Sequence, residues 1–479
     1  MTQSNIRPHP ILAASTLSEL IAPDADEHQR PMRQAAGAFS STLGHRVPTR
    51  AATGATTGLL IAWCAVGLGA DIRNGRYSLI AVAVVTLGVG LLLLTAWSAK
   101  RHVVTDEAEL RRGLAIAGAL AAICSVWHPA GLYGSGEAEL LSRAITLFCG
   151  LAFCGMAVGA LPRGRRQSYW LVGFMPIAGV LMIVSSPRPD IDDWYMSQAA
   201  ARALSHLQNI YTVHWSVPGQ SSNLYAYLPG SALFEWPFHV VLGDVRYGVL
   251  AALIATSVIL IRRSTTPTAS LLGCLVLLYP KALFGLELSW VDPIVTLGLC
   301  GAAYAAHHGR RNWAMAGLIL ALVCKQQAWL VLPLVFVWEH FGWRRAAISA
   351  LIAAGFISLW ALPNAHAFVY DVFRYQLKLP PRPDSLSIFA FFLNHGWQPP
   401  LALLALAVLL GYGIALRWLP RNAYGFLLGS AIIECMFNIA NKQSFFNEWQ
   451  LAATLLLAAV AFAPGQADAT RASRAVKSS

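Results

Sequence analysis

Residues 78–98 read SLIAVAVVTLGVGLLLLTAWS and contain no charged side chain. An α-helix of this length rises about 1.5 Å per residue and reaches across the roughly 30 Å hydrocarbon core of a bilayer. Similar runs recur along the 479-residue chain, in which 56% of residues are hydrophobic and only 12% are charged. The mean hydropathy is +0.53, and a soluble core cannot use so much apolar surface. The sequence therefore predicts an all-α fold, that of a polytopic helical membrane protein.

Apolar segments divide the chain into fourteen expected membrane crossings. An even number of crossings places both ends of the chain on one side of the membrane. Polar tails flank the crossings at 1–51, which is expected to be disordered, and at 464–479. We expect the helices at 52–72, 78–98, 112–132, 141–161, 169–186, 245–262, 268–285, 290–308, 312–325, 327–340, 344–362, 398–418, 422–441 and 446–463.

The distribution of basic residues predicts the orientation of these crossings. The two tails and alternate loops together hold 23 of the 35 Lys and Arg residues. Cytoplasmic loops carry such an excess, so we expect both tails in the cytoplasm and the protein in the plasma membrane. The net charge of +12 is then an orientation signal and an attraction to anionic lipid. Nucleic-acid binding is not expected, because the basic residues occur as pairs at helix ends and form no contiguous patch.

A polar interval at 187–244 interrupts the apolar runs, and the sequence at its start, residues 185–195, is SSPRPDIDDWY. Asp190 could cap a helix expected at about 191–207. Asp192 and Asp193 are adjacent, and neighbouring carboxylates repel, which raises a pKa toward the range of a general base. Carboxylates just outside the hydrocarbon suit chemistry on lipid-borne substrates. These three aspartates are therefore the candidate catalytic residues.

Two segments do not fit ordinary membrane crossings. Residues 229–243 are apolar enough to cross, but a crossing there would place the basic pair at 262–263 outside, so we expect an interfacial amphipathic helix on the outer leaflet. Residues 312–340 are too long for one crossing and short for two, and Lys-Gln-Gln at 325–327 lies at their centre. Short helices that meet there imply a polar cavity that enters the membrane from outside.

Further polar residues gather at the outer ends of the expected helices, some of them in a second outer loop at 363–397. Carboxylates, cations and aromatic side chains on one membrane face suit a site for a sugar and a phosphate. They are Tyr225, Tyr227, Asp244, Arg246, Tyr247, Glu287, Asp292, Lys325, Gln326, Arg374, Lys378, Arg382, Asp384, Asn441, Lys442, Gln443, Asn447 and Glu448.

Several of these residues have a structural alternative. Glu287 and Asp292 could cap helix ends, and Lys325 and Lys442 could be anchors whose ammonium groups reach the membrane surface. Glu434, in the middle of an expected crossing, is either functional or a protonated packing residue. The histidines show no metal-ligand spacing, and all eight cysteines fall in apolar runs, which is typical of core residues rather than of disulfides or a metal site.

The order of these motifs resembles that of GT-C glycosyltransferases. The likeness is closest to bacterial polyprenyl-phosphate-sugar-dependent enzymes of the alpha-mannosyltransferase type, particularly actinobacterial members. It covers about 169–463 and leaves four helices at 52–161 unexplained. The motifs are Asp190-Ile-Asp192-Asp193-Trp194, Asn209-Ile-Tyr211, Tyr225-Ala-Tyr227-Leu-Pro229, Asp244-Val-Arg246-Tyr247, Cys324-Lys325-Gln326, the loop at 375–387 and Asn441-Lys442-Gln443.

The resemblance implies transfer of a sugar such as mannose or arabinose from a polyprenyl-phosphate donor to a glycan or glycolipid acceptor of the cell envelope, on the outer face and with inversion. An aspartate removes the acceptor proton. Alignment of the Asn209-Ile-Tyr211 end favours Asp192, and Asp193 and Asp190 are the other candidates. Cations expected at the leaving phosphate are Lys442, Arg382, Arg374 and Lys325. The remaining substrate-binding candidates are Gln443, Gln326, Glu287, Asp292, Tyr227 and Arg246.

No metal is required by this scheme, although the Asp cluster could hold Mg²⁺. The alternative is a transporter or flippase of lipid-linked sugars without catalytic activity, in which carboxylates and lysines inside the membrane form a proton or substrate pathway. The sequence shows no internal repeat, and its polar residues gather at one face, which favours the enzyme. A structural subunit of a larger assembly is a third interpretation, which would account for the four helices at 52–161.

Overall fold

The computed structural model describes residues 55–99, 106–127, 131–217, 220–222 and 224–464. Both predicted tails lie outside these residues, apart from position 464. The described chain is mostly helical with very little strand, which confirms the predicted all-α class. Within it, strands β1 (Trp215–Val217) and β2 (Gln220–Ser222) form an antiparallel hairpin.

The first four described helices agree with the predicted crossings to within about five residues. α5 begins ahead of the predicted position 141 because Glu137 and Glu139 fit the positively polarised amino end of a helix. Apolar residues alone do not reveal such a polar first turn. The four helices are α2 (Ala55–Ile72), α3 (Leu79–Ala99), α4 (Glu107–Trp127) and α5 (Gly136–Val158).

The polar interval folds as short elements between two long helices. The predicted helix at 191–207 and the predicted amphipathic segment at 229–243 are both present. The second begins with Pro229, whose missing N–H costs nothing in a first helical turn, and it meets the next helix at an angle of 114°. The elements are α6 (Arg165–Ser185), α7 (Asp192–Ser205), η2 (Ile210–Thr212), α8 (Pro229–Leu242) and α9 (Arg246–Arg263).

The single helix predicted at 268–285 is wrong. The segment consists of η3 (Ala269–Gly273), α10 (Cys274–Leu277) and α11 (Ala282–Glu287). Pro280 interrupts it because proline has no N–H to donate, and Lys281 adopts a left-handed backbone with φ 58°. Residues 271–290 are buried apart from Lys281, so their apolar character reflects contact with protein.

The C-terminal half contains the remaining helices, and the chain leaves helical geometry at Lys325, as predicted for the Lys-Gln-Gln break. The elements are α12 (Asp292–His307), α13 (Arg311–Cys324), η4 (Gln326–Val331), α14 (Leu332–Val337), α15 (Trp343–Ala361), η5 (Leu362–Asn364), α16 (Ala365–Val369), η6 (Tyr370–Arg374), α17 (Tyr375–Lys378), α18 (Ile388–Asn394), α19 (Ala402–Trp418), α20 (Ala423–Ala440) and α21 (Phe446–Phe462).

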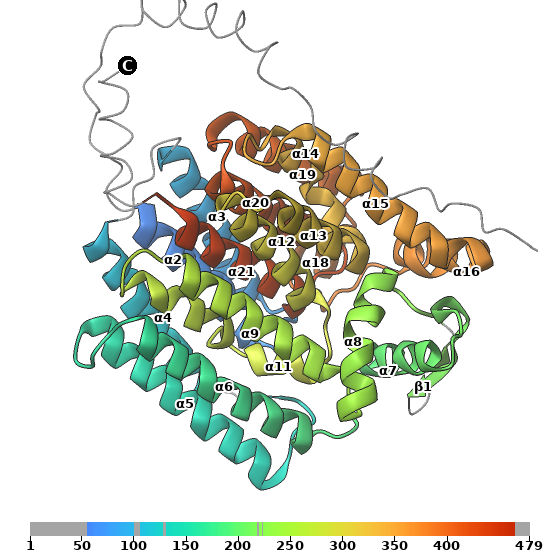
Figure 1. Cartoon of the computed structure of the whole chain (residues 1–479), viewed down its shortest axis with the longest axis horizontal. Helices are drawn as coiled ribbons and strands as arrows, with labels where there is room; N and C mark the ends of the chain where they lie inside the picture. Colours follow the sequence, from blue (N-terminus) through green and yellow to red (C-terminus); the bar gives the residue numbers. More distant parts are fainter. Residues whose placement is uncertain (1–54, 100–105, 128–130, 218–219, 223, 465–479) are drawn as a thin grey trace, which may run out of the picture. The chain divides into compact units, whose positions relative to one another are not determined.

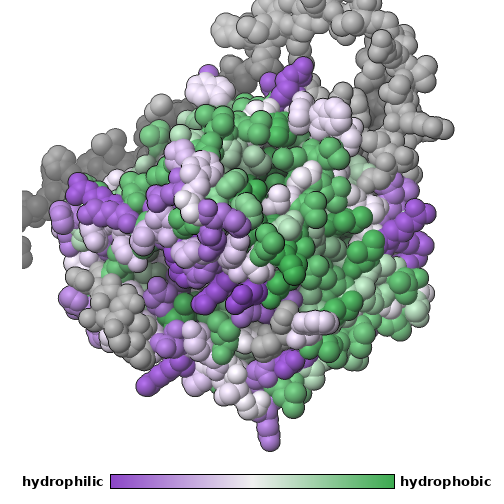
Figure 2. All heavy atoms as spheres, turned by 180° about the vertical axis from the view of Figure 1, so that it is seen from behind, coloured by the Kyte–Doolittle hydropathy of each residue, from purple (hydrophilic) through white to green (hydrophobic). Residues whose placement is uncertain are grey.

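Seven helices in the described ranges are long and apolar enough to cross a membrane, or up to eight if the bent pair α8–α9 counts as one. Large apolar side chains lie exposed on their outer faces, for example Leu87, Leu151 and Leu351. Figure 2 shows broad apolar areas, in green, on one face of the molecule. These features are those of a multi-pass membrane protein. The eight cysteines are unpaired, and all except Cys154 are buried, as expected of core residues.

Hydrogen bonds between helix ends define two opposite ends of the bundle. At one end, Lys325 after α13 and Asn447 in the first turn of α21 both bind Asp292 in the first turn of α12. At the other end, Arg165 at the start of α6 donates to the carbonyl of Ser264, which follows α9. We call the first of these the polar end. In Figure 1, α7, α8 and β1 lie near α16, and contacts of η2 with α16 and of α15 with α8 join these elements.

Candidate functional site

Asp193 is held by two hydrogen bonds at the polar end. Its Oδ1 accepts from the Tyr227 hydroxyl at 2.6 Å, and its Oδ2 accepts from the Trp290 indole N–H at 2.9 Å. The side chain is half-buried in the first turn of α7. Burial, and then the neighbouring charge of Asp192, raise the pKa of Asp193 to about 7. This carboxyl group can therefore accept a proton near neutral pH.

The two donors come from segments far apart in the sequence. Tyr227 precedes α8 and is buried, and burial raises the pKa of its hydroxyl well above the ordinary value, so the group stays a donor. Trp290 lies in the connection between α11 and α12 and stacks on Phe446 of α21, with ring centroids 5.8 Å apart. The position of this carboxylate is thus fixed by four parts of the chain: α7, the segment before α8, the α11–α12 connection and α21.

Asp190 and Asp192 lie exposed beside Asp193 and are not held in the same way. Asp192 is the first residue of α7, and its Oδ1 accepts only the N–H of Asp193, at 3.1 Å. The N-cap position belongs to Ile191, so Asp190 does not cap this helix. The backbone carbonyl of Asp190 accepts the Tyr133 hydroxyl at 2.6 Å. Among the three aspartates, Asp193 has the geometry of a positioned base.

A second charged group lies buried within electrostatic reach of Asp193. Lys325 Nζ donates to both oxygens of Asp292, at 2.8 and 2.9 Å, and Asn447 donates to the same carboxylate at 3.0 Å. The Lys325 side chain is only 9% exposed, so its ammonium group is paired inside the protein, which favours a site role over that of a surface anchor. The charge of Lys325 also interacts with Asp193, which places both groups in one electrostatic site.

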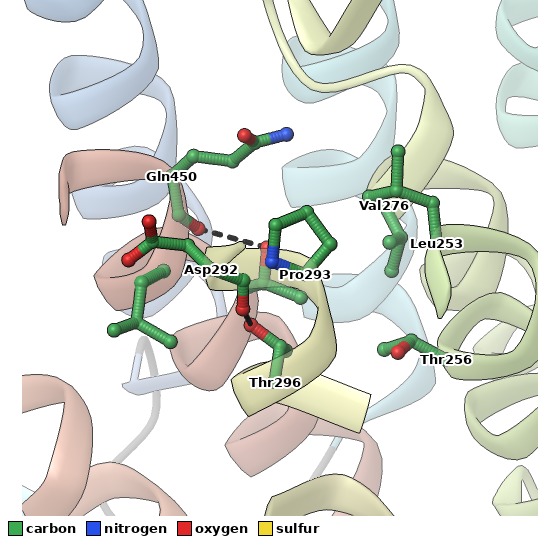
Figure 3. Close-up of a pocket in the computed structure, with 9 residues that line it drawn as sticks. Leu253, Thr256, Val276, Asp292, Pro293, Thr296 and Gln450 are labelled. Carbon is green, nitrogen blue, oxygen red and sulfur yellow. Dashed lines mark hydrogen bonds between the residues drawn. The ribbon is translucent and has the colours of Figure 1, made fainter. Parts of the chain in front are cut away.

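Further buried polar side chains lie in the helices around Asp292. Gln327 donates to Glu434 of α20, so this carboxyl group has a polar partner inside the bundle. Asp292 also lines a cavity of about 10 Å³, close to the smallest space that holds one water molecule. In Figure 3 the Thr296 hydroxyl donates to the backbone carbonyl of Asp292, and Gln450 lies on the same side of the cavity as Asp292, opposite Leu253 and Val276. Neither polar atom of the Gln450 amide has a partner among the described residues.

Arg246, a predicted substrate-binding residue, lies fully buried in a structural role. Its guanidinium forms a bidentate pair with Asp244, with the shortest contact at 2.6 Å, and donates to the Ser186 carbonyl at 2.9 Å. Trp194 also donates to Asp244. These bonds join the end of α6 to the start of α9 and to α7, and they leave Arg246 no free donor face toward Asp193.

The predicted residues around Lys442 organise the loop at 375–387. Lys442 Nζ donates to the carbonyls of Leu377 and Leu379 at 2.8 and 2.6 Å, and partial burial lowers the pKa of this amine. Gln443 donates to the carbonyl of Pro380 at 2.8 Å. The same loop contains a further cation, Arg382, which has a partner of its own.

Arg382 forms a bidentate pair with Asp384, at 2.9 and 2.6 Å, and lies over the Phe445 ring at 4.5 Å. Hydrogen bonds from this guanidinium hold the pKa of Asp384 below its ordinary value. Arg374, by contrast, is exposed, and its guanidinium has no hydrogen bond or ion pair within the described part of the chain. Arg374 is therefore the predicted cation that remains available to a ligand.

The other predicted residues bind backbone groups. Glu287 accepts the N–H groups of Leu132 and Tyr133 at 2.5 and 2.9 Å, which fixes the α4–α5 connection against α11. Gln326 donates to the carbonyls of Ala226 and Val372 at 3.1 and 3.2 Å. Both residues thus shape the walls of the site. Their roles depend on long-range contacts that no local pattern reveals.

Trp290, Phe446 and Tyr133 are site residues that were not predicted individually. A tryptophan beside Asp292 at a helix boundary was the available signal for Trp290, but its partner Asp193 lies 97 positions away. No group of three His, Cys, Asp or Glu side chains that could hold a metal occurs within the described ranges. Comparison with known proteins finds no family model, no curated protein and no solved structure that matches this chain.

Proposed function

We propose that this protein is a membrane glycosyltransferase that moves a sugar from a polyprenyl-phosphate donor to an acceptor hydroxyl of a cell-envelope glycan or glycolipid. The observation that carries the proposal is the Asp193 carboxylate, positioned by Tyr227 and Trp290 and with a pKa of about 7. Such a group is a general base near neutral pH. Its place at one end of an apolar helix bundle suits a substrate with a lipid tail.

The chemistry is a single displacement with inversion. Asp193 takes the proton of the acceptor hydroxyl as that oxygen forms a bond to the anomeric carbon of the donor sugar. The bond from the anomeric carbon to the phosphate oxygen breaks, and polyprenyl phosphate leaves with the electron pair. The hydrogen bonds from Tyr227 and Trp290 keep the base in place, and each carboxylate oxygen retains a further lone pair that can accept a proton.

Charge that develops on the leaving phosphate needs positive groups nearby. Lys325 lies within electrostatic reach of Asp193, although Asp292 offsets much of its charge. Arg374 is exposed and adjacent to Tyr375, whose hydroxyl interacts with Asp192 and Asp193. These two cations are the proposed electrostatic partners of the phosphate. The scheme requires no metal, and Mg²⁺ at the Asp cluster would be an addition to it.

The lipid tail requires an apolar surface next to the site. α8 buries Glu235 and the residues of its first turn but exposes Val240, Val241 and Leu242 at its other end. This exposed apolar end lies at the sharp bend between α8 and α9. We propose that it contacts the polyprenyl chain in the outer leaflet, in a GT-C-like arrangement with fourteen crossings and the polar end outside the cell.

A transporter of lipid-linked sugars is the second candidate, and the buried pair of Lys325 and Asp292 favours it. Charged residues inside a membrane commonly form ion or substrate pathways. These two, however, lie at the helix ends where Asp193 also lies, rather than along a path through the bundle. The arrangement therefore suits a one-sided site better than alternating access.

The test is transfer of radiolabel from polyprenyl-phosphate mannose or arabinose to an envelope glycan by the purified protein in nanodiscs. We expect labelled product with the parent protein and its loss with Asp193→Asn. The matched control is Asp190→Asn, which alters an exposed carboxylate nearby. Movement of the labelled lipid across vesicles without product would support the transporter instead.

A further inference from the structure

The connection between α2 and α3, from the helices that the GT-C likeness leaves unexplained, packs directly against the candidate site. Gly75 has φ +72°, and a Cβ there would lie 2.4 Å from the backbone nitrogen of Phe446. Only glycine fits here, because it has no Cβ and adopts a positive φ without strain. Phe446 in turn stacks on Trp290, the donor to Asp193. The connection is thus in contact with the aromatic layer behind the base.

Arg76, the next residue, is fixed at the mouth of the site by its backbone. It forms a β-bridge with Ser385, and the N–H of Tyr77 donates to the carbonyl of Asp384 at 2.8 Å. The charge of Arg76 interacts with Asp384 and with the Tyr133 hydroxyl. Tyr133 donates to the carbonyl of Asp190 and also interacts electrostatically with Asp192. Arg76 therefore lies within electrostatic reach of groups that contact or adjoin the aspartates.

Arg76 differs from most of the other cations around the site because it is exposed and its guanidinium has no hydrogen bond or ion pair with any residue that the structure describes, as is also the case for Arg374. Most of the cations predicted to bind substrate are engaged with protein groups. These are Lys325 with Asp292, Arg246 with Asp244, Arg382 with Asp384, and Lys442 with two carbonyls. An unpaired arginine guanidinium beside an apolar surface is suited to bind two oxygens of a phosphate at once.

We propose that Arg76 binds the phosphate of the polyprenyl-phosphate substrate, so that the four N-terminal helices contribute a ligand group to the site. This inference rests on the proposed function for the identity of the lipid. It assigns to the α2–α3 connection a role in donor recognition, and it explains why Gly75 and the bridge to Ser385 hold Arg76 against the second outer loop.

The experiment compares binding of a polyprenyl phosphate with binding of the corresponding polyprenol, by thermophoresis of the full-length protein in nanodiscs. We expect the parent to prefer the phosphate by about tenfold or more, the scale of a charged hydrogen bond. Arg76→Gln should lose that preference, and Arg76→Lys should retain part of it. Arg73→Gln is the matched control, since Arg73 is exposed on the same connection and should leave the preference unchanged.

A preference that survives in Arg76→Gln would overturn the inference, even if the parent transfers sugar. An equal loss of binding to phosphatidylglycerol would also overturn it, because Arg76 would then bind any anionic headgroup. A parent that does not distinguish the phosphate from the alcohol contradicts both the inference and the proposed donor. Loss of preference in Arg76→Gln, with no sugar transfer by the parent, would uphold the phosphate site and reject the enzyme.

Discussion

At the residue scale, the adjacent carboxylates of Asp192 and Asp193 have different environments. Side chains at consecutive helix positions point about 100° apart, so only one of them can face a given neighbour. Asp193 faces Tyr227 and Trp290, whereas Asp192 lies exposed. The sequence could identify the pair but not choose within it, because both donors come from distant segments. The alignment that favoured Asp192 did not include these contacts.

The pH dependence of transfer follows from the pKa of Asp193, which is raised to about 7. The base must be ionised, so the rate is fully present above this pKa and falls as pH decreases through it. Below the midpoint we expect about a tenfold decrease in kcat/KM per pH unit. Initial rates from pH 5 to 9 test this. A rate that does not change between pH 5 and 8 would argue against a base with this pKa.

Tyr227→Phe should move that midpoint to higher pH. The hydroxyl of Tyr227 donates to Asp193 and favours its ionised form, so its removal raises the pKa of the carboxyl further. We expect a shift of roughly one pH unit, with the plateau rate at high pH largely retained. Tyr225→Phe is the control, because the Tyr225 hydroxyl bonds Ser231 instead. An unchanged or lower midpoint in Tyr227→Phe would contradict the assigned hydrogen bond.

At the element scale, the ends of helices carry most of the long-range hydrogen bonds at the site. The loop that contains Leu377 and Asp384 is fastened by Lys442, Gln443 and a bridge to the α2–α3 connection. Such bonds are made to backbone carbonyls, which every residue has. For this reason a basic residue in the sequence looks the same whether it binds a ligand or a loop.

Lys442→Met should loosen this loop without a specific effect on the donor. The ammonium group donates to two carbonyls, so its removal should cost about 1–3 kcal/mol of local stability. We expect faster amide hydrogen exchange across residues 375–386, with donor KM within about twofold of the parent. Unaltered exchange together with a tenfold higher KM would instead assign Lys442 to the substrate phosphate.

At the scale of the whole molecule, apolar runs located most helices, and the error at 268–285 has a physical cause. Segment 268–285 is apolar because other parts of the protein surround it. Burial in protein and burial in lipid favour the same apolar residue types. Its break at Pro280 was the signal that a helix could not continue. The Lys-Gln-Gln break at 325–327 was visible in the sequence because its polar residues interrupt an apolar run. Asp292, the partner of Lys325, could not be identified from such a break in an apolar run.

The orientation of the bundle in the membrane can be tested by labelling single cysteines in intact cells. Ser222→Cys, in the β1–β2 hairpin at the polar end, should react with an impermeant thiol reagent added outside. Arg166→Cys, at the start of α6 near the opposite end, should react only after permeabilisation. The parent controls for its own mostly buried cysteines. The reverse pattern of labelling would place the site in the cytoplasm.

The central claim is that Asp193 is the base of a glycosyl transfer, and a single-turnover assay tests it most directly. Labelled donor is mixed with excess parent, Asp193→Asn or Asp192→Asn protein, each shown to be folded by its thermal transition. We expect Asp193→Asn to lose at least about a hundredfold in rate, as for the loss of a general base, and Asp192→Asn to lose far less. Equal rates for Asp193→Asn and the parent would contradict the claim.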